Sequence, residues 1–311
     1  MRKSERTPTV LLIGASGFIG RYVAEQLLKA GVRVRAAERD PRKAYFLQPL
    51  GSVGQVALTG FDMARPSHFA AAVDGVDAVI NLVGAFEGRL HLLHADGPGQ
   101  LAEAAKKAGV SAFVQISAIG ADPHADSLYG RTKGEGEARV RRAFPAATIL
   151  RPSVVFGPED QFTNRFASMA SLPIVPVLAP QTKFQPVYVR DLAQAIAKAA
   201  LDPATYGGKT YDIAGPEVLT MRALNERIAA LAGKKADFVD LPHVAGSAMA
   251  ALGFLPGAPL SRDQWAMLQH DNVAANEGLA AFGITPTALD AVAPEWLGRY
   301  RRGGRFAPTA A

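Results

Sequence analysis

The sequence predicts an α/β protein in which a doubly wound parallel sheet is followed by a smaller, irregular C-terminal domain. Three observations support this prediction. A short apolar run at residues 10–13 breaks into a glycine-rich segment and continues with the apolar spacing of an amphipathic helix. Strand-like and helix-like segments then alternate up to about residue 150. Beyond that point the alternation becomes irregular and prolines accumulate.

The expected elements follow one another at the spacing of β-α units. Strands are expected at 10–13, 32–37, 55–58, 76–83, 112–117 and 148–150, with helices at 21–31, 67–73, 90–108 and 126–143. Right-handed crossovers between such strands give a parallel sheet covered on both faces. We therefore expect a first domain over residues 1–151, its sheet completed by parts of 186–214, and a smaller domain formed by 152–185 and 215–311.

The composition sets limits on the class of protein. The chain has 311 residues, of which 49% are hydrophobic and 20% charged, as in a globular protein. It has no cysteine, so disulfides, thiolate nucleophiles and cysteine-ligated metals are excluded, which fits a cytoplasmic location. The longest apolar stretch, residues 244–260, is interrupted by glycines and prolines and is too short to cross a bilayer.

The chain is basic, which predicts an anionic partner. Its net charge is +6 and its isoelectric point is about 9.6. A phosphate-rich cofactor, an acidic protein surface or anionic lipid headgroups would fit this charge. Nucleic acid is not expected, because basic and aromatic residues do not interleave. A metal site is not expected either. His91 and His94 lie three residues apart with Asp96 nearby, but the spacing of the sequence suggests no further ligand that would complete a site.

The glycine-rich segment predicts a dinucleotide site. Gly14 suits a tight turn, Gly17 lets the backbone approach a pyrophosphate, and Gly20 lets the helix pack against the strand. The first N–H groups of the helix then point at the phosphates, where the helix dipole favours negative charge. With a strand before it and a helix after it, this motif indicates a Rossmann-type sheet.

The end of the second strand bears on the choice of cofactor. Glu38 could accept hydrogen bonds from the ribose of NAD, whereas Arg39 could pair with the 2′-phosphate of NADP. Arg42 and Lys43 add to a basic cluster, which favours NADP(H) over NAD(H). The alternative is a solvated loop of mixed charge.

Further along, residues that follow the strands predict the rest of the cleft. Asp62, after the third strand, is placed to accept from the adenine amino group, with Met63 beside it. After the fourth strand, Leu82, Val83 and Gly84 are small or apolar and could approach the adenosine and pyrophosphate.

Tyr129 and Lys133 carry the strongest catalytic signal. Four residues apart on an expected helix, they share a face, and Ser117 ends the fifth strand. A lysine cation beside a phenol stabilises phenolate, which predicts a lowered phenol pKa and proton exchange with a carbonyl or hydroxyl. Lys133 could also hold the nicotinamide ribose, and Ser117 could orient a substrate oxygen.

These motifs together resemble the extended and atypical short-chain dehydrogenase/reductase superfamily. A longer stretch, residues 150–167, is more specific and reads Leu-Arg-Pro-Ser-Val-Val-Phe-Gly-Pro-Glu-Asp-Gln-Phe-Thr-Asn-Arg-Phe-Ala. With Phe-Gln-Pro-Val-Tyr-Val-Arg-Asp at 184–191, it is similar to the NAD(P)H-binding accessory subunits of respiratory complex I, the family of alpha subcomplex subunit nine. Residues 117–122 and 262–264 fit the same family.

This resemblance implies a tightly held NADPH with a structural or redox-sensing role. It also implies complex I subunits and an anionic lipid surface as partners, and a location in the cytoplasm or on the cytoplasmic face of the inner membrane. From the motifs and the resemblance together, the expected nucleotide-binding residues are Gly14, Ser16, Gly17, Phe18, Ile19, Arg39, Lys43, Asp62, Met63, Leu82, Val83, Gly84, Ile116, Ser117, Tyr129, Lys133, Pro152 and Val154.

Two functions remain open at this point. The first is an accessory subunit whose nucleotide is retained without turnover. The second is a free-standing NAD(P)-dependent reductase or sugar epimerase/dehydratase, in which Tyr129 exchanges a proton and Lys133 and Ser117 support it.

Overall fold

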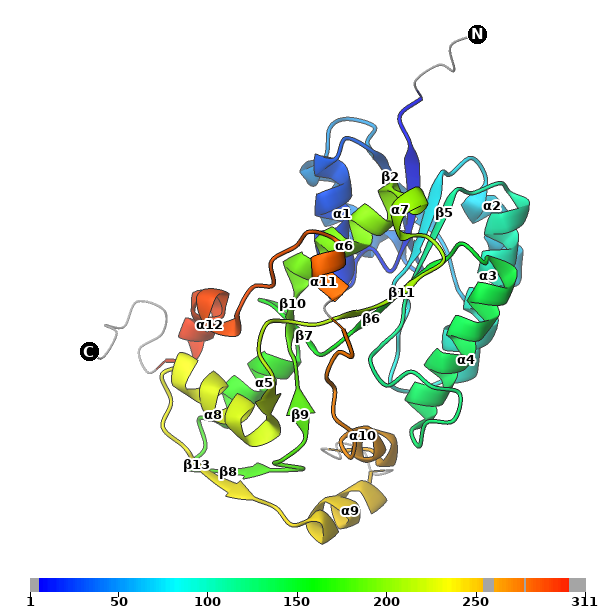
Figure 1. The fold of residues 1–311 in the computed structure, drawn as a ribbon. Coiled ribbons are helices and arrows are strands. Elements are labelled where there is room, and N and C mark those ends of the chain that lie inside the picture. Colours follow the sequence, from blue (N-terminus) through cyan, green and yellow to red (C-terminus); the bar gives the residue numbers. More distant parts are fainter. Residues whose placement is uncertain (1–5, 254–259, 277, 302–311) are drawn as a thin grey trace. The chain divides into compact units, whose positions relative to one another are not determined.

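The computed structural model describes residues 6–253, 260–276 and 278–301 of the chain (Figure 1). The chain divides into two compact units. Unit 1 comprises residues 1–152, 190–212 and 278–284, and unit 2 comprises residues 153–189, 213–277 and 285–311.

Unit 1 is built on a seven-stranded sheet with the order β11-β6-β5-β4-β1-β2-β3. The pairings from β3 through β6 are all parallel. The strands are β1 Thr9–Ile13, β2 Arg33–Glu38, β3 Val56–Gly60, β4 Ala78–Asn81, β5 Ala112–Ile116, β6 Thr148–Pro152 and β11 Thr210–Ile213. The strand order reverses between β1 and β4, and ligands of such sheets bind at the carboxyl ends of the strands beside this point. The predicted Rossmann-type α/β class is confirmed.

Helices cover both faces of this sheet. Figure 1 shows α2, α3 and α4 on one face and α1 and α6 on the other. The helices of unit 1 are α1 Phe18–Lys29, the 3₁₀ helices η1 Pro41–Leu50 and η2 Pro66–His68, α2 Phe69–Val73, the π-helix η3 Leu92–Asp96, α3 Gly97–Lys107, α4 Leu128–Ala143, α6 Val189–Leu201, α7 Pro203–Tyr206 and α11 Gly278–Ala281.

The core of unit 1 follows from the apolar strands. Four consecutive residues of β1, Val10–Ile13, are at most 2% exposed, as expected for a central strand covered on both faces. Leu11 and Ile13 pack with side chains of α2, α3 and α4 in one buried cluster that also contains Phe113 and Phe144. The sheet is therefore a rigid base for residues placed at its strand ends.

The ends of several elements differ from the prediction. The fourth strand is limited to Ala78–Asn81, and the sixth extends to Pro152. The single helix expected at 90–108 is a π-helix, Leu92–Asp96, that runs into α3. Apolar spacing does not distinguish these hydrogen-bond patterns, and short π segments in helices occur often at functional sites.

Unit 2 contains short elements, with pairs of strands in place of a large sheet. The pairs are β7–β10 and β8–β13, which are parallel, and β9–β12, which is antiparallel. The strands are β7 Val155–Phe156, β8 Ile174–Val177, β9 Lys183–Phe184, β10 Val187–Tyr188, β12 Leu219–Thr220 and β13 Asp237–Asp240. The helices are α5 Phe162–Met169, α8 Met221–Leu231, α9 His243–Ala251, α10 Arg262–Met267, α12 Leu289–Val292, α13 Pro294–Leu297 and the 3₁₀ helix η4 Gly298–Tyr300.

The stretch 150–167, which carries the family resemblance, contains a buried carboxylate at the start of α5. Asp160 is 4% exposed and accepts from the backbone N–H of Gly157 at 2.9 Å and of Thr163 at 2.5 Å. The Thr163 hydroxyl donates to the same carboxylate at 2.5 Å. These bonds fix the turn before α5, so Asp160 has a structural role here.

Among the described residues, no helix combines the length and apolar character that a membrane span requires.

Candidate nucleotide-binding site

The glycine-rich turn between β1 and α1 has the geometry of an anion-binding loop. Gly14 has a φ of +83°, a left-handed conformation that favours glycine. Its N–H donates to the carbonyl of Ala37 at 3.2 Å, which joins the turn to the end of β2. The helix α1 begins after Gly17, which has no side chain to cap it, and its first turn contains no acidic residue. The first N–H groups and the helix dipole are thus directed at the turn.

Gly20 makes the close approach of α1 to this turn possible. A Cβ added at Gly20 would lie 2.1 Å from the carbonyl oxygen of Gly14 and 2.7 Å from that of Ala15. Both contacts are with backbone, which cannot move aside cheaply. The turn and helix therefore form a cradle that fits a pyrophosphate.

The end of β2 and the segment that follows it carry two acidic and three basic side chains. Glu38 accepts from the backbone N–H of Ser16 at 2.5 Å, so its carboxylate lies at the glycine-rich turn. The Arg42 guanidinium forms two bonds to Asp40, at 2.9 and 3.0 Å, which removes it from the predicted basic cluster. Arg39 is exposed, and neither it nor Lys43 has an ion pair within the described parts of the chain. Arg39 and Lys43 are therefore the two members of the predicted basic cluster that stay available to an anion.

The residues expected near the adenosine lie at neighbouring strand ends. Leu82 follows β4 and lies beside Gly14, whose added Cβ would meet the Leu82 Cβ at 3.4 Å. Asp62 accepts from the N–H of Ala64 at 2.9 Å, so one of its oxygens is already bonded within its own turn. Met63 is 3% exposed and packs in the core of unit 1. It is therefore a core residue in this structure.

Three of the residues predicted to bind the nucleotide, Val83, Gly84 and Ile116, lie around the Lys133 ammonium. The ammonium donates to the carbonyls of Val83 at 3.3 Å and Ile116 at 3.2 Å. A Cβ added at Gly84 would lie 3.6 Å from the same nitrogen. The carboxyl ends of β4 and β5 therefore meet α4 at Lys133.

Pro152 and Val154, also predicted to bind the nucleotide, fall in different units. Pro152 ends β6, and its carbonyl accepts from the N–H of Ile119 at 3.1 Å. Val154 belongs to unit 2, where its N–H donates to the Asn272 side chain at 3.1 Å.

Tyr129 and Lys133 share one helix as predicted, but the expected phenol pKa is wrong. The Ser127 hydroxyl accepts from the Gly130 N–H at 3.0 Å and begins α4 just before Tyr129. The Lys133 nitrogen lies 5.8 Å from the centre of the Tyr129 ring and bonds to carbonyls instead. Burial raises the pKa of Tyr129 to about 12, because the charged phenolate loses its solvation. The Tyr129 phenol is therefore protonated at neutral pH.

Ser117 offers an unused hydroxyl at the same place. It is 3% exposed, and its Oγ has no hydrogen-bond partner within the described residues. A buried hydroxyl without a partner is costly and fits a site that a ligand oxygen completes.

His94 is the residue that the sequence analysis missed in this site. It was considered only as a metal ligand with His91 and Asp96, but the three side chains have different partners. His91 lies 3.4 Å from Glu135, and Asp96 pairs with Arg139 at 2.5 Å. His94 is 1% exposed and its ring lies edge-on to Tyr129, with centroids 5.3 Å apart. Burial, with the nearby Lys133 charge, lowers the pKa of His94 to about 3, so the ring is neutral.

The arrangement fits a nicotinamide dinucleotide. The cradle at Gly14–Gly20 and the cations Arg39 and Lys43 would hold its phosphates, and Lys133 with Ser117 would meet its other end. Such a cofactor supplies hydride chemistry when bound. Of this chain's own groups, Tyr129 can hold or release a proton, and Lys133 can donate to ribose or substrate oxygens.

Burial of Lys133 predicts a measurable pH dependence of stability. Burial lowers the pKa of Lys133 to about 8 from 10.5, although Glu137 acts in the opposite direction. The unfolded chain therefore binds more protons than the folded protein between these two values, and this lysine's penalty on stability is relieved as pH rises. We expect the wild type to gain about 2 kcal/mol relative to Lys133→Met between pH 7 and 9.5. Urea denaturation at both pH values measures this gain, and parallel behaviour of the two proteins would contradict it.

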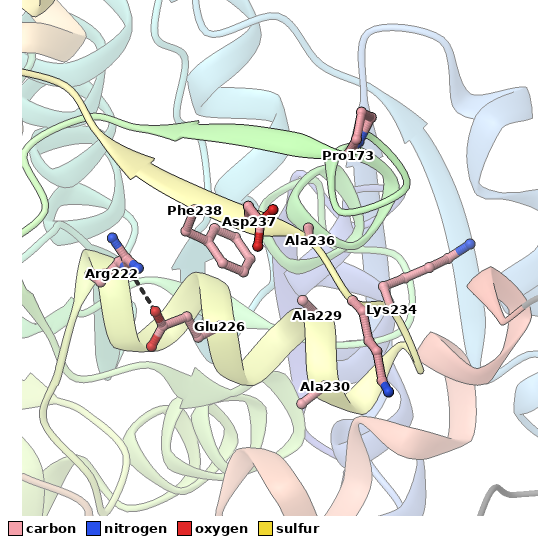
Figure 2. A pocket seen from close by; sticks show the side chains of 10 residues that line it. Pro173, Arg222, Glu226, Ala229, Ala230, Lys234, Ala236, Asp237 and Phe238 are labelled. Atoms are coloured by element: carbon pink, nitrogen blue, oxygen red, sulfur yellow. Dashed lines mark hydrogen bonds and ion pairs between the residues drawn. The ribbon is translucent and has the colours of Figure 1, made fainter.

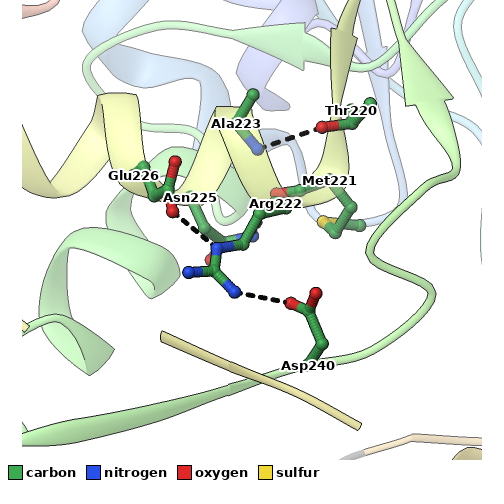
Figure 3. Close-up of polar contacts among 7 residues, drawn as sticks. All are labelled: Thr220, Met221, Arg222, Ala223, Asn225, Glu226 and Asp240. Atoms are coloured by element: carbon green, nitrogen blue, oxygen red, sulfur yellow. Dashed lines mark hydrogen bonds and ion pairs between the residues drawn. The ribbon is translucent and has the colours of Figure 1, made fainter. Parts of the chain in front are cut away.

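Unit 2 has a separate hollow between α8 and β13 (Figure 2). Its volume is about 720 Å³. Arg222 bonds to Glu226 at 2.5 Å and to Asp240 at 2.8 Å (Figure 3), and its guanidinium lies 5.8 Å from the Phe238 ring. These pairs of Arg222 join α8 to β13. The hollow holds no histidine, serine or tyrosine among its lining residues.

Comparison with known proteins agrees with this geometry. Residues 14–203 match the model of the NAD(P)H-binding family. The chain is 32% identical to the mitochondrial NADH dehydrogenase [ubiquinone] 1 alpha subcomplex subunit 9 of Arabidopsis thaliana, over 94% of this chain and 78% of the relative. It is 30% identical to the mitochondrial NADH-ubiquinone oxidoreductase 40 kDa subunit of Neurospora crassa, over 94% and 80%. An NADPH-dependent quinone oxidoreductase of Escherichia coli, solved with NADPH, shares the fold, with a TM-score of 0.75, 22% identity, and coverage of 93% and 99%.

The fold and the matched family define an NAD(P)H-binding protein with a Rossmann-type sheet. Within that class, the chain belongs to the family of alpha subcomplex subunit 9 of NADH dehydrogenase. The resemblance stated from residues 150–167 and 184–191 is confirmed.

Proposed function

We propose that this protein holds NADP(H) as a peripheral accessory subunit of respiratory complex I. The similarity to named subunits over 94% of this chain and 78–80% of the relatives is the observation that carries this proposal. A likeness confined to the nucleotide fold would cover unit 1 alone, but this one extends through unit 2 as well.

The preference for NADP(H) over NAD(H) belongs to this proposal. Arg39 and Lys43 supply positive charge at the end of β2, and Arg42 is neutralised by Asp40. Glu38, which would favour NAD, bonds to the Ser16 N–H. The same proposal includes nucleotide binding by the eighteen residues, from Gly14 to Val154, that the sequence analysis predicted for this role.

The net charge of +6 supports a location at an anionic surface. We place the protein in the cytoplasm, at the cytoplasmic face of the inner membrane, where it contacts complex I subunits and anionic lipid. The assignment of residues 152–185 and 215–311 as a substrate-side domain stays a prediction.

A second candidate is a free-standing NAD(P)-dependent reductase or epimerase. This candidate is favoured by the presence in unit 1 of Tyr129, Lys133 and a Ser117 hydroxyl that has no hydrogen-bond partner among the described residues. A nucleotide with a purely structural role needs no proton-holding phenol.

Native purification separates the two candidates. Membranes are solubilised in mild detergent at low salt, and the protein is followed by a tag at its own chromosomal locus through native electrophoresis. We expect it to migrate with complex I and to carry NADPH when the isolated band is extracted. Migration alone, in the soluble fraction, would overturn the subunit proposal and favour the enzyme.

A further inference from the structure

An aromatic ring that the sequence analysis did not consider lies against Tyr129. Phe86 belongs to the segment that follows β4, and its side chain is 56% exposed. Its ring nevertheless stacks on the Tyr129 ring, with centroids 4.9 Å apart and an interplanar angle of 20°. A single exposed phenylalanine needs no explanation by itself. This one, however, stacks on the phenol ring that could exchange a proton with a substrate.

His94 holds the segment that carries Phe86. Its Nε2 accepts from the backbone N–H of Ala85, the residue before Phe86, at 3.1 Å. Because Nε2 accepts, the neutral ring carries its proton on Nδ1, which donates to the Thr132 hydroxyl at 2.9 Å. The Thr132 hydroxyl in turn donates to the carbonyl of Tyr129 at 3.2 Å. One buried ring therefore connects the Phe86 segment to the Tyr129 turn of α4.

We propose that Phe86 is a cap over Tyr129 and that His94 is the positioning residue that keeps the cap closed. The cap shields the phenol from water, and a substrate oxygen reaches Tyr129 only when the Phe86 ring moves. The functional meaning rests on Tyr129 acting as the proton-exchanging group, whereas the cap itself rests on the contacts above. His94 from η3 and Lys133 from α4 are titratable groups that lie close to the Tyr129 ring.

The chemistry of the site agrees with a closed cap. The raised pKa of Tyr129 comes from burial, to which a stacked ring contributes by excluding water. The low pKa of His94 keeps its hydrogen bonds to Ala85 and Thr132 unchanged through the physiological range, so the cap is not opened by pH.

Nitration of Tyr129 by tetranitromethane, located by peptide mass mapping, tests the cap without a known substrate. The reagent attacks phenolate, and one unit of pKa changes the phenolate fraction tenfold. We expect Phe86→Ala to be nitrated at Tyr129 about tenfold faster than wild type at pH 8. Phe86→Trp should keep the wild-type rate. Phe46→Ala, which removes another partly exposed ring of unit 1, is the matched control and should also leave it unchanged.

The positioning role of His94 is tested by a second set of variants. His94→Ala should accelerate nitration like Phe86→Ala, and the double variant should be no faster than either alone, because both open the same cap. Unchanged Tyr129 nitration in Phe86→Ala would overturn the cap. Additive rates in the double variant would overturn the positioning role of His94. Circular dichroism establishes that each variant is folded, and NADPH binding measured by fluorescence tests the proposed function separately.

Discussion

Replacing Gly20 by alanine is expected to remove nucleotide binding and to destabilise the protein. The new Cβ would lie 2.1 Å from the Gly14 carbonyl oxygen, so either α1 moves away from β1 or the turn deforms. Overpacking against backbone costs about 3 kcal/mol, and the same distortion of the phosphate cradle corresponds to at least about 100-fold weaker NADPH binding. Denaturant unfolding and fluorescence titration with NADPH measure the two effects.

Gly60→Ala is the matched control for this variant. Gly60 ends β3 in the same unit, and a Cβ added there meets no atom within 4 Å. It should retain both stability and NADPH affinity. If Gly20→Ala bound NADPH as tightly as Gly60→Ala, the cradle would not be the phosphate site.

Replacing Arg39 by alanine should weaken NADPH binding by roughly 30-fold and NADH binding by less than about threefold. Charge-assisted hydrogen bonds to a phosphate contribute about 2 kcal/mol, and only NADPH carries the 2′-phosphate. Arg39 is exposed, so the loss comes from the ligand contact without disturbance of the core. Isothermal titration with both nucleotides at fixed salt gives the ratio.

Arg42→Ala serves as the comparison, because its guanidinium is already bonded to Asp40. It removes the same charge three residues further along and should change the NADPH to NADH ratio little. Equal losses for the two nucleotides in Arg39→Ala would place the 2′-phosphate elsewhere.

The sequence was sufficient for the parts of the fold that depend on local chemistry. Apolar runs predicted the central strands, and the spacing of Gly14, Gly17 and Gly20 predicted the turn whose φ and close approach require glycine. The four-residue spacing of Tyr129 and Lys133 predicted that they share one helix, and both lie on α4. These features are set by residues close to one another along the chain.

The rest of the site depends on contacts between distant segments. His94 meets Thr132 across 38 residues, and Lys133 meets Val83 across 50. No periodicity in the sequence indicates that a histidine in a helical pattern will turn inward through a π-helix. The sequence predicted a lowered pKa for Tyr129, whereas the pKa is raised. The prediction considered the charge of Lys133, which stabilises phenolate, but not the burial of the ring, which destabilises it.

The division of the chain has a consequence for how the protein can be dissected. The chain passes between the units after residues 152, 189, 212, 277 and 284, so no single cut yields both units whole. A fragment that stops at Pro152 would lack β11, which leaves β6 as an unpaired sheet edge open to aggregation. It would also lack α6, whose Arg190 bonds to Glu25 of α1 at 3.1 Å. An expression library of simple truncations would therefore yield insoluble pieces, and the nucleotide domain is better isolated by joining residues 6–152, 190–212 and 278–284 through short linkers.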